Sequence, residues 1–421
     1  QLPSSPASPG DYKIQLSATK YMRYSLLCAP LIDCLGPALL AAPGENRFPK
    51  LPFYERFVAI DNACGWPTIT VLPNGTLACL LWPLPVHGTT EGATECWHST
   101  DGGKFWKKAG VPVPNAPKTS REGHASGLAA DGSYVALVTG WDNRRKPAGW
   151  QADPLQPEED FFLGANLLNA IPAVSRDGGR TWKQYPPVFP DTGHPERQGI
   201  LGFGRIAPLA DGTLGVMMYR DEGAPNRSVT GHGVGTARDE CSFFTSADGG
   251  ATWQRRGQLS TERKHNEVAW LRLENGNLYA AARTDDGFEH LDAFRSTDEG
   301  RTWKAEGVLS LPNQVPADLT RLPDGRLLLS YGLRNNGDRS INVRIGDAEA
   351  HRWGGPIRLV DLEGATDEPN LPQPTRDNGY PTTVVLADGT LVTAYYSRGM
   401  PSHHRYHVGV VRWKLPPMAK K

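Results

Sequence analysis

Three residues have the types and the placement needed for nucleophilic chemistry on a bound substrate. Glu267 precedes and Arg283 ends a segment, 270–283, in which two apolar stretches flank Asn-Gly; Tyr380 precedes a similar segment at 383–396. A phenol is a poor nucleophile at neutral pH, but a neighbouring carboxylate can accept its proton. A planar guanidinium can hold a carboxylate by two hydrogen bonds. The sequence therefore predicts a Tyr–Glu pair beside a cation, provided that the fold brings the three together.

The elements that would position these residues are six repeated hairpins. Each consists of an apolar strand, an Asn-Gly or Asp-Gly turn and a second apolar strand, and they occupy 69–81, 126–138, 206–219, 270–283, 319–332 and 383–396. Asn-Gly and Asp-Gly accept the positive φ that tight hairpin turns require. Glu267 and Tyr380 thus stand at equivalent places, just before the first strand of two hairpins.

A second phrase, Ser-x-Asp-x-Gly-x-x-Trp, follows four of these hairpins. It occupies 99–106, 175–182, 246–253 and 296–303, and a degenerate copy lies at 346–353. Serine and aspartate side chains can hydrogen-bond to local backbone N–H groups, and the tryptophan would anchor the turn in the core. We therefore expect aspartates 101, 177, 248 and 298 to be structural and not catalytic.

Together the two phrases define units of about four antiparallel strands, repeated six times. Such periodicity predicts an all-β fold, a six-bladed β-propeller of four-stranded antiparallel blades over residues 45–416. The strand at 55–60 is expected to complete the last blade. In a propeller the first strands of the hairpins converge on a central axis, so residues at their starts would face one funnel.

The eight-residue phrase resembles the Asp-box, or BNR repeat, of the sialidase (neuraminidase) superfamily, and the resemblance extends over nearly the whole chain after residue 45. It implies an exo-acting glycoside hydrolase that releases a terminal, acidic sugar. In that superfamily a glutamate before a hairpin activates a tyrosine nucleophile, and an arginine after the hairpin grips the substrate carboxylate. Glu267, Tyr380 and Arg283 occupy these positions, which implies a retaining mechanism through a covalent intermediate.

The same resemblance implies further substrate-binding arginines, but one of the arginines of the superfamily is missing here. Arg339 resembles the third carboxylate-binding arginine of the superfamily, and Arg334, which follows the fifth hairpin, is an equally suitable inward residue. The Arg-Ile-Pro phrase that supplies the first arginine is replaced by Gly-Trp-Pro at 65–67. Trp66 could instead stack on a sugar, and Arg205, in a similar phrase, belongs to the third unit. We therefore expect weak carboxylate recognition and little turnover of an aryl sialoside.

The general acid should come from the loop after the first hairpin, where sialidases place an aspartate. Glu91 is the residue that we expect to fill this role, and His87 is a second possibility. In the second unit, Arg121 and His124 stand at the start of the first hairpin strand, a position suited to substrate contacts.

Three interpretations remain open. The first is the glycoside hydrolase just described, with a terminal sugar of a glycan or glycoconjugate as its partner. The second is a non-catalytic propeller that binds glycans or proteins, because Asp-box folds also serve other functions. The third is a glycosidase or lyase of different chemistry that uses inward residues such as His124 and Glu267. No motif for a cofactor or a metal is present, so none is expected.

The composition and the two ends of the chain indicate which partners and which compartment to expect. Forty-five basic and forty-five acidic residues give a formal net charge of zero, which does not favour binding to nucleic acid or to an anionic membrane. Residues 1–44 are interpreted as an extension in which 22–44 resembles a secretory signal too interrupted to span a membrane. Residues 417–421 are interpreted as a tail. We expect a secreted or periplasmic monomer. The cysteines leave disulfide pairing unassigned.

Overall fold

The computed structural model describes residues 51–85, 91–142, 166–188, 199–221, 239–259, 263–284, 289–335, 338–362, 378–400 and 403–415. The chain divides into two compact units, residues 1–45 and 46–421, and all the described residues belong to the second. The expected signal sequence, His87 and the expected C-terminal tail lie outside the described residues. Within the described ranges the secondary structure is strand and turn, and no helix there could cross a membrane. The all-β prediction is thus confirmed.

The strands pair mainly with neighbours in sequence. Four sheets contain four strands each: β2 (Thr68–Val71), β3 (Leu77–Leu81), β5 (Glu95–Ser99) and β6 (Lys107–Gly110); β18 (His265–Arg272), β19 (Leu278–Thr284), β20 (Leu291–Ser296) and β21 (Lys304–Val308); β22 (Gln314–Arg321), β23 (Leu327–Asn335), β24 (Asp338–Gly346) and β25 (Ile357–Asp361); and β26 (Asn378–Val385), β27 (Leu391–Met400), β28 (His403–Trp413) and β1 (Tyr54–Asp61).

An eight-stranded sheet joins two further sets of four antiparallel strands. These are β8 (Gly123–Leu128), β9 (Tyr134–Thr139), β12 (Ile171–Ser175) and β13 (Lys183–Gln184), and β14 (Leu201–Pro208), β15 (Leu214–Asp221), β16 (Asp239–Ser246) and β17 (Gln254–Gln258). The two sets meet through a parallel pairing of β8 with β14. Two short pairs complete the described strands: β4 (Gly92–Ala93) with β7 (Ser120–Arg121), and β10 (Trp141–Asp142) with β11 (Asn166–Leu167).

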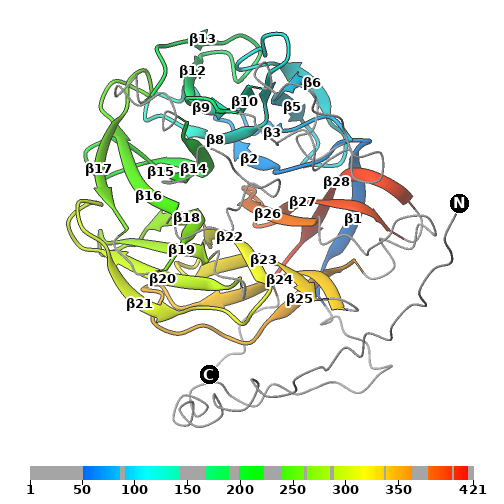
Figure 1. Ribbon diagram of the computed structural model, residues 1–421. Helices are drawn as coiled ribbons and strands as arrows, with labels where there is room; N and C mark the ends of the chain where they lie inside the picture. Colours follow the sequence, from blue (N-terminus) through cyan, green and yellow to red (C-terminus); the bar gives the residue numbers. More distant parts are fainter. Residues whose placement is uncertain are drawn as a thin grey trace, which may run out of the picture. The chain divides into compact units, whose positions relative to one another are not determined.

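The first strands of the six sets contact one another in a closed series. β2 contacts β8, β8 contacts β14, and the series continues through β18, β22 and β26 back to β2. Figure 1 shows the sets following one another around a common centre in sequence order. The strand expected to complete the last set does so, because β1 pairs antiparallel with β28 from Tyr54↔Trp413 to Asp61↔His407.

All six predicted hairpins are present, and their turns use glycine as the sequence indicated. In the first, Gly75 has φ +81° and donates its N–H to the carbonyl of Leu72 at 2.8 Å, while the N–H of Leu72 reaches the carbonyl of Thr76 at 2.8 Å. A φ in this region costs little only for a residue without a Cβ. Asn74, which also matches a glycosylation acceptor, uses its Oδ1 to accept the N–H of Thr76.

The Asp-box turns are hydrogen-bonded as the side chains predicted. In the third, the Ser246 hydroxyl donates to Asp248 at 2.8 Å and accepts the N–H of Gly250 at 2.9 Å. Asp248 also accepts the N–H and the hydroxyl of Thr252, and the indole of Trp253 donates to the carbonyl of Gly250. Because the aspartate is occupied by its own turn, the box is a structural device, as expected.

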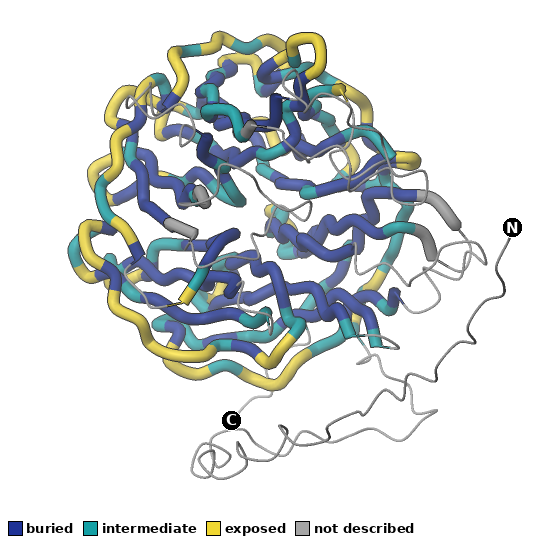
Figure 2. The backbone as a smooth tube through the Cα atoms, viewed as in Figure 1, coloured by how far each residue is buried: buried dark blue, intermediate teal, exposed yellow. Residues whose placement is uncertain are grey.

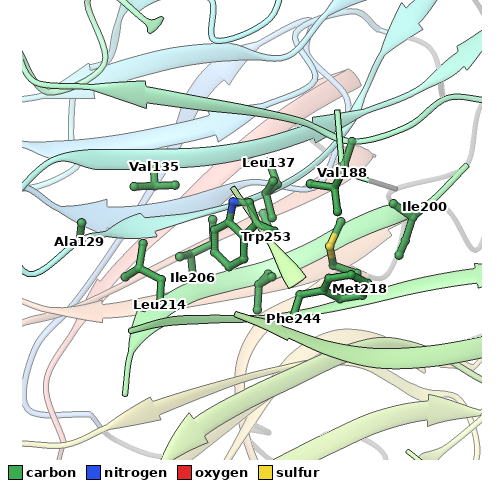
Figure 3. Packing of buried hydrophobic residues seen from close by; sticks show 13 residues of the cluster. Ala129, Val135, Leu137, Val188, Ile200, Ile206, Leu214, Met218, Phe244 and Trp253 are labelled. Carbon is green, nitrogen blue, oxygen red and sulfur yellow. The ribbon is translucent and has the colours of Figure 1, made fainter. Parts of the chain in front are cut away.

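The box tryptophans anchor the packing between neighbouring sets of strands. Trp253 lies in a cluster with Val135 and Leu137 of β9 and with Ile206 and Phe244 of the next set (Figure 3). Burial of such apolar side chains is the main favourable contribution to folding. Figure 2 shows the inner strands buried and the outer strands and turns largely exposed, so the repeated turns lie at the periphery.

Candidate active site

Glu267 and Tyr380 each sit at an irregularity near the start of a first strand. The β18–β19 register shifts between Asn266 and Val268, and the β26–β27 register shifts between Gly379 and Thr382. Glu267 has φ +36° and Tyr380 has φ +47°, a region that residues with a Cβ rarely occupy and that is often found at functional sites. A bulge can redirect a side chain out of the regular alternation.

The two irregularities bring the predicted residues into contact. The Tyr380 hydroxyl donates to Glu267 Oε1, although the residues are 113 positions apart in sequence. Arg283 Nη1, from the end of β19, lies 2.5 Å from Glu267 Oε2 and 3.3 Å from the Tyr380 hydroxyl oxygen. Tyr380 is 7% exposed, Glu267 4% and Arg283 2%. The structure therefore places a phenol, a carboxylate and a guanidinium in one buried cluster.

Glu289 is a fourth member of this cluster that the sequence analysis missed. Its carboxylate accepts a hydrogen bond from Arg283 Nη2 at 2.5 Å, and its side chain is 25% exposed. Its carbonyl accepts the N–H of Asn313, whose own carbonyl accepts the N–H of Arg334. Arg283 is thus held by two carboxylates, one on each terminal nitrogen.

Burial and charge set the protonation states of the cluster. Burial, and then the negative charge of Glu267, raise the pKa of Tyr380 well above its usual value. Burial opposes the charge of Arg283, but the charges of Glu267, Tyr380 and Glu289 outweigh it and raise the pKa of Arg283. At neutral pH the phenol therefore keeps its proton and the guanidinium keeps its charge. The Tyr380 proton already points at a carboxylate.

Arg334 and Arg339 lie beside this cluster. The guanidinium of Arg334 is 5.3 Å from the centroid of the Tyr380 ring, and its Nε and Nη2 donate to the carbonyl of Asn378 at 3.2 and 3.0 Å. Arg339 is the direct partner of Arg334 in the β23–β24 register, which puts both side chains on one face of the sheet. Both arginines are buried.

Aromatic residues surround the other sides of Tyr380. Trp66 meets its ring edge-on at a centroid distance of 6.2 Å, Phe203 at 6.0 Å, and the tilted ring of Tyr396 lies at 5.6 Å. Trp66 has φ +55°, so the first unit also departs from regular geometry where its strand begins. In the Gly65–Trp66–Pro67 phrase, where the resemblance would place the first arginine, the side chain that packs against the expected nucleophile is therefore the indole of Trp66.

A pocket opens beside Tyr380, between the first strands of all six sets. It is lined by Trp66, Pro67, Thr68, His124, Phe203, Gly204, Arg205, Ala269, Trp270, Ala317, Asp318, Tyr380, Pro381 and Thr382. Arg205 donates to Asp318 through Nε at 2.9 Å and Nη2 at 2.8 Å, and also to the carbonyl of Thr383. Arg205 thus reaches the pocket already paired with Asp318, a partner that no sequence pattern indicated.

Of the remaining predicted residues that the structure describes, His124 lines this pocket, whereas Arg121 and Glu91 do not. His124 lines it and is 4% exposed; its Nδ1 lies 3.4 Å from the Thr94 hydroxyl. Burial lowers the pKa of His124 to about 4, so the ring is uncharged at neutral pH. Arg121 donates to the carbonyl of Asn169 at 3.2 Å and is not among the pocket-lining residues. Glu91 is exposed, just before β4.

This arrangement can carry out proton-coupled nucleophilic attack. A phenol whose proton is shared with a carboxylate can attack an electrophilic carbon while the carboxylate takes the proton. The adjacent Arg283 holds that carboxylate in place and lies close enough to interact with charge that develops on the phenol oxygen. Cys64, Cys79, Cys96 and Cys241 are buried, and no disulfide joins any two of these four described cysteines.

Solved structures with similar folds include a protein of unknown function and sialidases. A protein of unknown function from Dyadobacter fermentans is similar with a TM-score of 0.66 and 19% identity, over 87% of this chain and 100% of that one. The Trypanosoma rangeli sialidase in complex with sialic acid has a TM-score of 0.56 at 17% identity, over 88% of this chain and 59% of the sialidase. No curated protein matches the chain.

A third similar structure is the K499G mutant of NanB sialidase from Streptococcus pneumoniae, with a TM-score of 0.56 at 12% identity, over 88% of this chain and 71% of the enzyme. This chain spans about three fifths of the length of the Trypanosoma sialidase, and identities this low show a common fold only. The BNR repeat-like domain family matches residues 147–393, more than half of the chain. The chain therefore belongs to the BNR repeat-like domain family and is a divergent member with a sialidase-like fold.

Proposed function

We propose that the protein is an exo-acting glycoside hydrolase that retains anomeric configuration, with Tyr380 as nucleophile and Glu267 as its base. The observation that carries this proposal is the hydrogen bond from Tyr380 to Glu267, with Arg283 in contact with both. The strain at both residues supports it, since a purely structural pair could form without positive φ at either position.

The first step would form a bond between the Tyr380 oxygen and the anomeric carbon. The phenol proton passes to Glu267, the glycosidic carbon–oxygen bond breaks, and the leaving oxygen takes a proton from a general acid. In the second step the former acid takes a proton from water as the water oxygen attacks the anomeric carbon, the bond from that carbon to the Tyr380 oxygen breaks, and Glu267 returns its proton to the Tyr380 oxygen. Glu91 remains the residue proposed as the acid; its exposed position before β4 allows it to approach a bound substrate from the solvent side.

The proposal includes a six-bladed propeller as the framework. The closed series of contacts among β2, β8, β14, β18, β22 and β26 supports it. A further support is that a Cβ at Gly103, in the box of the first set, would lie 3.0 Å from Val392 Cγ1 in the last set. In such a framework the starts of the first strands meet at one end of the axis.

The partner proposed is a terminal sugar of a glycan or glycoconjugate. An acidic sugar is what the resemblance implies, and its carboxylate would have to reach Arg283, Arg334 or Arg339. The Trypanosoma structure with sialic acid and the covalent intermediate with 2,3-difluorosialic acid show that similar folds bind such ligands.

The test begins with a panel of aryl glycosides to find a substrate that is cleaved. NMR of the first turnovers should then show the product with the anomeric configuration of the substrate. Tyr380→Phe keeps the ring but removes the nucleophilic oxygen, so its rate should fall by roughly 10³-fold or more. Tyr331→Phe is the matched control, because Tyr331 is also buried but its hydroxyl has no hydrogen-bond partner among the described residues. An inverted product, or a fully active Tyr380→Phe, would rule out the double displacement.

One observation favours a second candidate. His124 lines the pocket as an uncharged imidazole, which suits a glycosidase or lyase in which it acts with Glu267. In that case His124→Gln would abolish activity and Tyr380→Phe would not.

A further inference from the structure

We infer that the pocket beside Tyr380 takes an uncharged sugar ring and excludes a ring that carries a carboxylate. This inference rests on the proposed function, whose substrate class it specifies, and it departs from the acidic sugar that the resemblance implies. It depends on four features of the described residues: the occupancy of Arg283, the charge balance of the pocket wall, the position of the remaining arginines and the nature of the surfaces that replace them.

Both terminal nitrogens of Arg283 are already paired with protein carboxylates. Nη1 donates to Glu267 at 2.5 Å and Nη2 donates to Glu289 at 2.5 Å. A bidentate grip on a ligand needs two parallel N–H donors from one guanidinium, and both terminal nitrogens here already face protein carboxylates. Arg283 is only 2% exposed and is not among the residues that line the pocket, so a carboxylate seated in the pocket would not contact it.

The wall of the pocket carries no net charge. The cation in the described wall is Arg205, and Asp318 neutralises it by two hydrogen bonds. His124 is uncharged at neutral pH. A carboxylate bound here would lose its hydration without gaining an opposite charge as partner. This loss costs a large free energy in a partly desolvated site.

The other two cations are close but do not face the pocket. Arg334 lies over the ring of Tyr380 and donates two hydrogen bonds to the carbonyl of Asn378. Arg339 is its cross-strand partner and is 5% exposed. Neither residue is among those that line the pocket, so a ligand seated there contacts the ring of Tyr380 and not the guanidinium behind it.

The surfaces that the pocket does offer suit a neutral sugar. Trp66, Phe203 and Trp270 contribute aromatic surface, against which the apolar C–H face of a sugar can pack. His124 Nε2 is buried and makes no well-aligned hydrogen bond among the described residues, and the nearby backbone of Leu80 and Trp66 interacts with the ring. A buried polar atom of this kind requires a partner, and a sugar hydroxyl, which can both donate and accept, fits either tautomer of the ring.

The experiment measures binding separately from turnover. Isothermal titration of the Tyr380→Phe variant would compare aryl glycosides of neutral hexoses, 6-deoxyhexoses and pentoses with an aryl sialoside and an aryl glucuronide. At least one uncharged glycoside should bind roughly 100-fold or more tightly than both carboxylated probes, because only the carboxylates bring an unpaired charge into the pocket. Equal or tighter binding of a carboxylated probe, or no binding of any uncharged glycoside, overturns the inference.

Two substitutions at position 66 sharpen the test. Trp66→Arg adds an unneutralised cation to the pocket wall, so the affinity for the aryl sialoside should rise by roughly tenfold or more relative to the best neutral probe. Trp66→Phe is the matched control, which changes the size of the aromatic side chain without adding charge and should keep the preference for the neutral probe. A Trp66→Phe variant that came to prefer the sialoside would contradict the charge argument.

This inference and the proposed function fail in distinguishable ways. If wild-type protein cleaves an aryl sialoside with retention and Tyr380→Phe does not, the proposed function stands and the uncharged-ring inference falls. If an uncharged glycoside binds with the expected preference but is never hydrolysed, or is hydrolysed equally well by Tyr380→Phe, the inference stands and the proposed mechanism falls.

Discussion

The Asp-box turns and the starts of the first strands lie at opposite ends of the same sheets, and they differ in how much they repeat. In all four boxes a serine hydroxyl bonds the aspartate, and the tryptophan indole bonds the glycine carbonyl. At the strand starts the residue changes from one set to the next: Trp66 in the first, Glu267 in the fourth and Tyr380 in the sixth.

The boxes and the strand starts are stabilised in different ways. The boxes use hydrogen bonds between residues no more than four positions apart. These bonds satisfy their own turns, so each box can be copied without reference to the others. The strand starts hold residues at positive φ and place ionisable groups out of water, which stabilises the fold only if the partners are all present. Repetition therefore marks the framework, and loss of repetition marks the candidate chemistry. The four predictions below test this division.

The largest effect is expected at Arg283. Replacing it with methionine leaves Glu267 and Glu289 buried or half-buried beside each other without their shared cation. Breaking a buried ion pair from one side costs about 3–5 kcal/mol, so urea unfolding should show a loss of that order together with loss of activity. Arg301→Met, in an exposed box turn, is the control and should change stability by less than about 0.5 kcal/mol. If the two variants lost similar amounts of unfolding free energy, the distinction between the strand starts and the boxes would be wrong.

A box tryptophan should affect stability without affecting chemistry. Trp253→Ala removes the largest side chain from the cluster between two neighbouring sets, at a cost of about 3 kcal/mol. The rate per folded molecule should stay within about twofold of the wild type, because Trp253 does not line the pocket. Calorimetry combined with active-site titration would measure both quantities. A large fall in the rate of the folded fraction would show that the framework and the site are coupled.

Box aspartates should contribute less, and the degenerate box least. Asp248→Ala removes acceptors for Ser246 and Thr252 and should cost about 1.5–2 kcal/mol. Asp347, in the fifth unit, accepts two backbone N–H groups and lies 3.5 Å from Arg352 Nε, but its box contains no serine or threonine hydroxyl. Asp347→Ala should therefore cost less. The reverse order, measured by thermal unfolding, would mean that the hydroxyl contacts do not stabilise the box.

Lowering the pH is expected to have the smallest effect on stability. Burial opposes ionisation of Asp101, Asp248 and Asp298, but hydrogen bonds from serine, threonine or backbone donors outweigh it and lower their pKa values. A lowered folded-state pKa contributes stability that is present above the unfolded value of about 4 and is lost as pH falls through the folded value. The unfolding free energy should therefore drop below about pH 4, and less steeply in Asp248→Asn. Identical slopes for the two proteins would contradict this contribution.

The repeated part of the fold could be predicted because its signals are local. Glycine with asparagine or aspartate at fixed offsets specified the six hairpin turns and the boxes. The strand expected at 55–60 to complete the last set is β1, which pairs with β28. The contact of Glu267 with Tyr380 was also predictable, since equivalent positions of repeated units meet when the units are arranged around a centre.

The rest could not be predicted because it depends on long-range pairing. Glu289 follows a hairpin without any motif, and only the folded chain shows that it reaches Arg283. Arg205 and Asp318 are 113 residues apart and belong to different sets. Positive φ at Glu267 and Tyr380 runs against the preference of both residue types, so no propensity argument could have placed the bulges that aim these side chains.

The most direct test of the account is to identify the residue that becomes glycosylated. An activated 2-fluoro glycoside of whichever sugar the enzyme cleaves would slow the second step, and peptide mass spectrometry would locate the attached sugar. The account predicts a single modification on Tyr380, absent from Tyr380→Phe and greatly slowed in Glu267→Gln. A sugar attached to a different residue, or turnover of the parent substrate without any covalent adduct, would contradict it.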